Sequence, residues 1–264
     1  MTLDFWNLKG LAVPIPIDMS LIYEHICKEN SQKQLAVLID PENEDLSKLQ
    51  FKIQQINKST LTHIFVGGST DVDNRTESVI KTIKAHTNLP VVLFPGDTNQ
   101  ITPVADALLF LSLISGRNPD YLIHKQVEAI PKLLESELEV ISTGYILIES
   151  GSTSAVERVS ATKPLSRTSI STIVHTAMAG ELLGMKLIYL EAGSGALSPV
   201  PISIIRAVKS RLSIPLIVGG GIKTTQQLDA AYDAGADLVV IGTAFENDTL
   251  FFNKINSSKI LNTN

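Results

Sequence analysis

The chain alternates short apolar runs with amphipathic segments along most of its length. This pattern is typical of a parallel sheet whose strands are joined by covering helices. Eight runs have the length and the flanking turn residues of buried strands: 34–40, 63–68, 90–96, 105–113, 139–150, 186–192, 215–221 and 237–242. Eight strands alternating with helices in 264 residues predict an α/β fold, the (β/α)8 or TIM barrel.

The pattern predicts a helix over residues 20–30, before the first strand. We therefore expect a single barrel domain over residues 1–264 with an N-terminal helical extension.

The series of helices between the strands has one interruption. Between the third and fourth strands only residues 96–104 intervene, and they include Gly96 and Pro103. That segment is too short for an ordinary crossover helix. We therefore expect a loop there, which either packs closed over the barrel or leaves a groove.

Composition excludes several classes of protein. A net charge of −5 and a pI near 5.6 argue against a nucleic-acid partner, which requires a basic face. Cys27 is the only cysteine, so no internal disulfide is possible and a reducing cytoplasm is the expected location. We find no export signal and no apolar run long enough to span a bilayer, which leaves at most a peripheral membrane contact.

Two glycine-rich strand ends lie near the C-terminus, PLIVGGGIKT and DLVVIGTAFEN. Glycines at Gly219, Gly220, Gly221 and Gly242, with Thr243, expose backbone N–H groups at the starts of two helices, where the peptide dipoles attract an anion. In a (β/α)8 barrel the loops after strands 7 and 8 often hold a phosphate. We therefore expect a phosphorylated small molecule as ligand.

A metal site is expected on the other side of the barrel mouth. Asp40 ends the first strand and Ser69 follows the second, so sheet spacing places them roughly 5 Å apart. One carboxylate, one hydroxyl, several waters and ligand phosphate oxygens form a usual Mg²⁺ site. The alternatives are that Asp40 caps the following helix and that Ser69 or Thr70 caps the next one.

The densest polar cluster ends the sixth strand and reads YLEAGSG, from Tyr189 to Gly195. Alternation along a strand places Tyr189 and Glu191 on one face, where both reach the barrel mouth. Glu191 then accepts a hydrogen bond from a substrate hydroxyl, or acts as a base if its pKa is raised. The alternative is an interior Tyr and Glu paired with Lys or Arg.

Eight segments together resemble one family. They are LAVLIDPEN, IFVGGST, VVLFPGDTNQI, ADALLFLSLISGRNPDYLI, GYILIESGSTSAV, LIYLEAGSGA, PLIVGGGIKT and VVIGTAFE, in order from about Leu35 to Glu246. They are similar to the geranylgeranylglyceryl phosphate synthases, a family that also contains the bacterial heptaprenylglyceryl phosphate synthases. The N-terminal extension and the YLEAGSG form resemble the longer of its two branches.

The resemblance implies a prenyltransferase that joins sn-glycerol 1-phosphate to a polyprenyl diphosphate, forms an ether lipid precursor and releases diphosphate, with Mg²⁺ and an assembly of identical subunits. It implies that Asp40 and Ser69 bind the metal. It places glycerol phosphate against Tyr189, Leu190, Glu191, Ala192, Gly193, Ser194, Gly195, Gly220, Gly221, Gly242 and Thr243, with Tyr189 and Glu191 as the catalytic pair.

One position departs from the family pattern, because Leu38 stands where shorter members have a lysine. A groove beside the third and fourth strands, near Phe94, Phe110 and Leu111, is the expected place for the prenyl tail. Two other functions remain open. One is another phosphate-binding barrel enzyme, an isomerase or a synthase, and the other is a non-catalytic binder of prenyl phosphates.

Overall fold

The computed structural model describes residues 21–28, 33–69 and 74–242. Within them, eight parallel strands close into a barrel in sequence order, with β8 paired to β1. The strands are β1 (Gln34–Ile39), β2 (His63–Val66), β3 (Val91–Leu93), β4 (Ala107–Leu113), β5 (Glu139–Leu147), β6 (Leu187–Glu191), β7 (Leu216–Gly219) and β8 (Leu238–Ile241). The (β/α)8 barrel expected from the sequence is confirmed, and each strand falls within its expected run.

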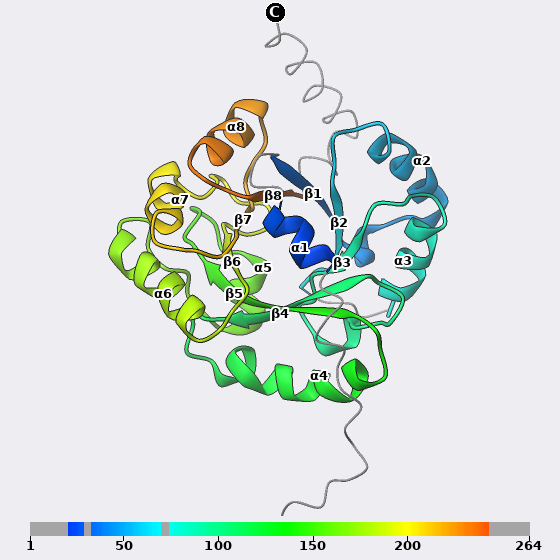
Figure 1. Ribbon diagram of the computed structural model, residues 1–264, viewed down its shortest axis with the longest axis horizontal. Helices are drawn as coiled ribbons and strands as arrows, with labels where there is room; N and C mark the ends of the chain where they lie inside the picture. The colour runs from blue at the N-terminus through cyan, green and yellow to red at the C-terminus, as the bar shows by residue number, and fades with distance from the viewer. Residues whose placement is uncertain (1–20, 29–32, 70–73, 243–264) are drawn as a thin grey trace, which may run out of the picture.

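Helices surround the barrel (Figure 1). They are α1 (Leu21–Lys28), α2 (Leu46–Ile56), α3 (Thr76–Lys84), α4 (Lys125–Leu134), α5 (Ala155–Ser160), α6 (Ile170–Leu182), α7 (Ile202–Lys209) and α8 (Thr225–Asp233). A π-helix, η3 (Asp120–His124), leads directly into α4, and the 3-10 helix η1 (Pro41–Asn43) follows β1. None of the helices in the described residues has both the length and the apolar character needed to cross a bilayer.

The connection from β3 to β4 is the expected exception. It contains only the one-turn 3-10 helix η2 (Thr98–Gln100), so a loop replaces the covering helix as expected. The domain boundaries expected at 1 and 264 stay a prediction, since residues 1–20 and 243–264 lie outside the described part of the chain.

Strand alternation divides the core into two layers. One set of side chains packs outward between sheet and helices, as do Val37, Ile64 and Leu190. The other set fills the barrel interior, as do Phe65 and Tyr189, both fully buried. The interior is therefore a packed core, and a ligand can enter only at its mouth.

Helix α1 closes the bottom of the barrel and appears at the centre of the ring of strands in Figure 1. Its apolar residues Ile22 and Ile26 join the interior cluster. The carboxylate of Glu139, the first residue of β5, accepts hydrogen bonds from the backbone N–H groups of Ile22 and Tyr23 at 2.8 and 2.9 Å. Glu139 thus satisfies two N–H groups in the first turn of α1, which have no partner within a helix.

We expect the substitution Glu139→Ala to lower the free energy of unfolding by about 1–2 kcal/mol, because it removes both of these bonds. Urea unfolding measures this change. Glu137→Ala, at an exposed position two residues away, is the control and should cost much less. Equal losses in the two variants would show that Glu139 does not anchor α1.

Candidate functional site

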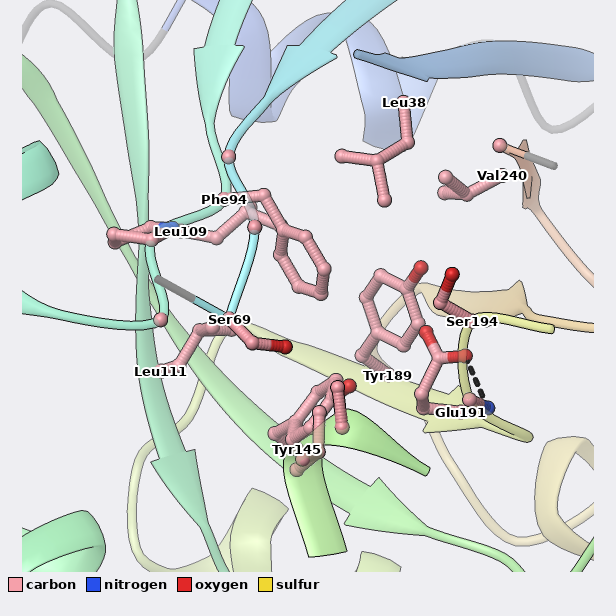
Figure 2. A pocket seen from close by; sticks show the side chains of 18 of the residues that line it. Leu38, Ser69, Phe94, Leu109, Leu111, Tyr145, Tyr189, Glu191, Ser194 and Val240 are labelled. Carbon is pink, nitrogen blue, oxygen red and sulfur yellow. Dashed lines mark hydrogen bonds between the residues drawn. The ribbon is translucent and has the colours of Figure 1, made fainter. Parts of the chain in front are cut away.

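One cavity of about 360 Å³ lies at the mouth of the barrel, where the strands end (Figure 2). It has three parts. The aspartate side holds Asp40, Gly68 and Ser69, and the glycine side holds Gly193, Gly195, Gly220, Gly221 and Gly242. An apolar arm extends from the mouth and is lined by Ile101, Leu108, Phe110 and Ala129. Residues from both ends of the sequence therefore meet at one opening.

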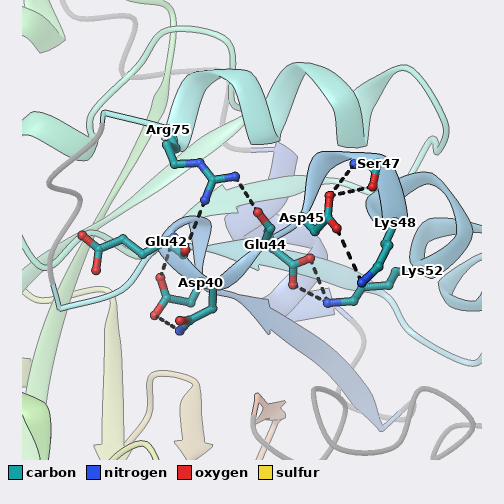
Figure 3. Close-up of polar contacts among 9 residues, drawn as sticks. Asp40, Glu42, Glu44, Asp45, Ser47, Lys48, Lys52 and Arg75 are labelled. Carbon is teal, nitrogen blue, oxygen red and sulfur yellow. Dashed lines mark hydrogen bonds and ion pairs between the residues drawn. The ribbon is translucent and has the colours of Figure 1, made fainter.

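On the aspartate side, Asp40 both caps a turn and lines the cavity. One carboxylate oxygen accepts the backbone N–H of Glu42 at 3.1 Å, and the other accepts the side-chain amide of Asn43 at 3.0 Å (Figure 3). The two interpretations of Asp40 open at the sequence level are thus compatible. Ser69 lies at the end of the neighbouring strand β2, and its hydroxyl points toward the centre of the cavity in Figure 2.

The donor set on this side fits Mg²⁺. Carboxylate and hydroxyl oxygens are hard ligands of the kind Mg²⁺ takes, with the remaining positions left to water and phosphate. Space is kept for the carboxylate by Gly68, because a Cβ there would lie 2.7 Å from an Asp40 carboxylate oxygen. Within the described residues, no group of three or more His, Cys, Asp or Glu side chains could hold a metal.

Glu191 is the most unusual group in the cavity. The residue is 5% exposed, and its carboxylate accepts the Gly193 backbone N–H at 2.5 Å and makes no ion pair with any described residue. Burial raises the pKa of Glu191 to about 7, against the opposing effects of the Gly193 N–H and the nearby Tyr189 hydroxyl. The interpretation of Glu191 as a residue paired with Lys or Arg is therefore wrong within the described residues. A carboxyl group with a pKa near 7 can exchange a proton at neutral pH.

Tyr189 lies beside Glu191 on the same face of β6, as strand alternation predicts. The Tyr189 hydroxyl is completely buried and has no hydrogen-bond partner of normal geometry in the described part of the chain. Burial, followed by the nearby Glu191 carboxylate, raises the pKa of Tyr189 well above its usual value, so the phenol stays neutral. An unpartnered buried hydroxyl at a cavity wall is suited to a ligand.

Four glycines on the glycine side have positive φ angles, a backbone conformation that favours glycine. Gly193, Gly195, Gly220 and Gly221 have φ angles of 100, 72, 81 and 71°. A Cβ on Gly220 would lie 2.3 Å from a carboxylate oxygen of Glu191, and one on Gly219 would lie 2.2 Å from the Tyr189 hydroxyl. The glycines therefore make room for these two side chains as well as exposing N–H groups to an anion.

The structure does not place every expected residue at the cavity surface. Ser194 lines it, whereas the side chains of Leu190 and Ala192 face away and belong to the outer core between sheet and helices. Contact between a ligand and Leu190 or Ala192 would have to involve their backbones. Thr243 lies outside the described residues.

Among the residues that line the cavity, sequence reasoning missed Tyr145, Tyr121 and Lys125. Tyr145 lies on β5, and alternation along residues 139–150 with Ile141 and Leu147 inside would have placed it in the barrel. Lys125 and Tyr121 belong to α4 and the π-helix η3, which gave no sequence signal of their own.

The apolar arm lies where the covering helix is missing, between η2 and α4. Phe110 and Leu108 face this arm from the outer side of β4, while Leu111 and Phe94 border the mouth. Lysines on α4 bridge the arm. Lys125 forms an ion pair with Asp97, and the Lys132 ammonium donates to the Thr98 carbonyl at 2.8 Å. Of the two possibilities left open for this loop, the structure therefore supports a groove.

This fold and cavity define a barrel enzyme that binds a phosphorylated substrate together with an apolar one. Comparison with known proteins agrees. The model of the PcrB family matches residues 26–261, and the chain belongs to that family, which confirms the resemblance noted in the sequence.

Three similar proteins are named as geranylgeranylglyceryl phosphate synthases. The geranylgeranylglyceryl phosphate synthase of Flavobacterium johnsoniae is 56% identical over 236 residues, which cover 89% of this chain and 97% of that protein. The synthase of Thermococcus kodakarensis is 41% identical over 222 residues, covering 83% and 86%. The structure of (S)-3-O-geranylgeranylglyceryl phosphate synthase from Thermoplasma acidophilum in complex with sn-glycerol-1-phosphate is 34% identical, with a TM-score of 0.83 and coverage of 89% and 95%.

We expect the unfolding free energy of the Glu191→Gln variant, relative to that of the native protein, to increase as pH rises. The Glu191 carboxyl titrates near 4.5 in the unfolded chain and near 7 in the fold, so the folded state binds an extra proton between these values. That contribution to stability is full below about pH 4.5 and is lost as pH rises through 7. Glutamine carries no charge, so the difference in unfolding free energy should shift by about 2 kcal/mol in favour of the variant between pH 5 and pH 8.

Urea unfolding of both proteins at the two pH values measures this shift. Glu137→Gln, at an exposed site, serves as the control and should differ from the native protein by the same amount at both pH values. A constant difference for Glu191→Gln would mean that the carboxyl group is not held at a raised pKa.

Proposed function

We propose that this protein is a prenyltransferase that joins sn-glycerol 1-phosphate to a polyprenyl diphosphate, giving an ether-linked prenylglyceryl phosphate and diphosphate. One observation carries the proposal. A single cavity combines a buried carboxyl group of pKa about 7, a set of hard oxygen ligands across the mouth, and an apolar arm. The names of the similar proteins support the same reaction.

The glycine side suits the acceptor. A phosphate bound there would accept hydrogen bonds from backbone N–H groups around Gly195, Gly220 and Gly221, since the Gly193 N–H donates to Glu191. The glycerol hydroxyls then lie toward Glu191 and the unpartnered Tyr189 hydroxyl. The substrate in the Thermoplasma acidophilum structure, sn-glycerol-1-phosphate, has the phosphate and hydroxyls that this arrangement requires.

The aspartate side and the apolar arm suit the prenyl donor. Asp40 and Ser69 would hold Mg²⁺, which supplies positive charge that neutralises the departing diphosphate. The prenyl tail would leave the mouth past Phe94 and Leu111 into the apolar arm. Burial of a tail in this arm is favourable by about 25 cal/mol per Å² of apolar surface removed from water.

Glu191 orients the acceptor and takes its proton. An allylic diphosphate ionises readily, so the attacking hydroxyl requires alignment more than strong basicity. A carboxylate with a pKa near 7 accepts the hydroxyl proton as the new C–O bond forms. Leu38 at the β1 end presents an apolar side chain to the mouth and so does not contribute a charge to phosphate binding.

Several finer properties belong to the same proposal. We propose Mg²⁺ as the cofactor, the cytoplasm as the location, ether phospholipid biosynthesis as the process, and an assembly of identical subunits. Hard oxygen ligands support the metal, and the family resemblance supports the assembly. The net charge of −5 supports a role without nucleic acid.

We expect the purified chain to release diphosphate from a prenyl diphosphate when sn-glycerol 1-phosphate and Mg²⁺ are both present. Donors of increasing length should show an optimum, since the apolar arm is finite. The sn-glycerol 3-phosphate enantiomer and chelation of Mg²⁺ should each abolish release. Glu191→Gln should lower turnover by about 100-fold or more without changing the KM for glycerol phosphate.

The outcomes separate the alternatives. No release with any donor would exclude the transferase and leave a phosphate-binding barrel enzyme of another kind. Binding of both substrates without release would indicate a non-catalytic carrier. Near-normal turnover of Glu191→Gln would keep the reaction but remove Glu191 from its catalytic role.

Gly220→Ala should lower kcat/KM by about 10- to 100-fold, because its Cβ would displace the Glu191 carboxylate, 2.3 Å away, from its position. The matched control is Gly184→Ala, since Gly184 has a similar φ of 88° but nothing within 4 Å of the added Cβ. Each variant should lose about 1–2 kcal/mol from the positive φ alone, and Gly220→Ala should lose more because its Cβ would also lie 2.7 Å from the Gly193 backbone nitrogen. Steady-state kinetics and urea unfolding of the two variants test this, and equal activity in both would contradict it.

A further inference from the structure

The turn that carries Asp40 is held by an arginine that does not line the cavity. Arg75 lies immediately before α3, and its guanidinium donates hydrogen bonds to the backbone carbonyls of Glu42 and Glu44, at 3.1 and 2.5 Å. In Figure 3, Arg75 reaches the turn from above, while the Asp40 carboxylate lies below it. The two bonds come from different nitrogens, so the planar guanidinium spans two carbonyls at once.

Only one residue separates Arg75 from the Asp40 carboxylate. Glu42 accepts the arginine through its carbonyl and donates its N–H to one Asp40 carboxylate oxygen at 3.1 Å. The other carboxylate oxygen accepts the side-chain amide of Asn43, which belongs to the same 3-10 helix η1. Both oxygens of Asp40 therefore have partners within the turn, and any shift of the turn moves the carboxylate.

The groups on both sides of this contact are firmly anchored. Glu44 ends the turn, and its buried carboxylate forms an ion pair with Lys52 of α2 at 2.7 Å. The carbonyl of Arg75 accepts a backbone N–H from the first turn of α3 at 3.0 Å. Arg75 therefore joins the connection that follows β1 to the connection that follows β2. The proposed metal ligands Asp40 and Ser69 begin the same two connections.

We propose that Arg75 is a positioning residue, which holds the Asp40 carboxylate in the orientation that binds the metal. This inference rests on the metal site of the proposed function, and Arg75 acts through the turn alone. Residues that fix the orientation of a metal ligand commonly contribute about 10- to 100-fold to metal affinity. The reason is that a ligand already held in place loses little conformational freedom when the metal binds.

The direction of the effect separates positioning from simple electrostatics. A guanidinium close to a cation site repels the cation, so an effect of charge alone would make Arg75→Ala bind the metal more tightly. Positioning requires the opposite, weaker binding, because the turn loses both carbonyl contacts. Arg75→Lys keeps the positive charge but lacks the planar fork, and its affinity should lie between those of the native protein and Arg75→Ala.

The experiment measures the binding of Mn²⁺ to the full chain without substrate, from the loss of the electron paramagnetic resonance signal of free Mn²⁺. Arg75→Ala should bind Mn²⁺ about 10-fold more weakly than the native protein. Asp40→Asn should abolish the binding. The Mg²⁺ concentration that gives half-maximal turnover should rise in Arg75→Ala, while the KM for sn-glycerol 1-phosphate should stay constant, since the glycine side lies across the mouth.

Arg167→Ala is the matched control. Arg167 is half-buried like Arg75 and donates to a backbone carbonyl, that of Pro199, at 3.0 Å. This bond joins the connection that follows β5 to the one that follows β6, on the other side of the barrel from Asp40. Its loss should lower the urea midpoint of unfolding, as the loss of Arg75 does, but should leave the Mn²⁺ affinity unchanged.

Native or tighter Mn²⁺ binding by Arg75→Ala, or an equal loss in Arg167→Ala, would overturn the inference and assign Arg75 to stability alone. Should circular dichroism show that Arg75→Ala does not fold, native affinity in Arg75→Lys would overturn it instead. No Mn²⁺ binding by the native protein would overturn the metal site and this inference together. Absence of turnover with every prenyl donor would overturn the proposed reaction, while the Mn²⁺ measurements would still decide the role of Arg75.

Discussion

The structure of the site depends on one unfavourable arrangement, a carboxyl group buried at the mouth of a largely apolar barrel. Desolvation penalises the charged form of Glu191, and a single backbone N–H from Gly193 offsets only part of that penalty. This buried carboxyl group and the neighbouring Tyr189 hydroxyl also require glycine at positions 219 and 220, because they fill the space that a side chain there would occupy. The glycines that suggest a phosphate site in the sequence thus serve a second purpose, which is to make room for these two groups.

The missing helix after β3 has an equally direct structural consequence. Without it, the outer faces of Leu108 and Phe110 would be exposed to water, and α4 approaches them instead across a narrow gap that forms the apolar arm. The ends of this gap are fixed by polar contacts, the Asp97–Lys125 ion pair and the Lys132 hydrogen bond to Thr98. A (β/α)8 barrel thereby gains an apolar binding surface beside its usual polar mouth, which suits a substrate with an apolar tail.

The sequence predicted more of the fold than of the site. Short apolar runs bounded by turn or polar residues locate all eight strands, because a strand buried on both faces has a local signature. The same reasoning located Asp40 and Glu191 at strand ends. It also included Leu190 and Ala192, whose side chains pack outward because alternation allows only every second residue of β6 to face the mouth, so that only their backbones could meet a ligand. Tyr145 was overlooked because it lies within its strand among apolar residues and not in the polar segment that follows the strand end.

By itself, the sequence determined the barrel, the short β3–β4 connection and the residue types at each strand end, since these follow from local periodicity and chain length. Only the tertiary structure decided how those ends meet. It placed Phe94, Tyr145 and Tyr189 in mutual contact although they come from three separate parts of the chain, and it buried Glu191 deeply enough to raise its pKa to about 7. The physical reason is that burial and ring contact depend on barrel closure, which brings together residues far apart in the chain and so leaves no pattern in any one segment.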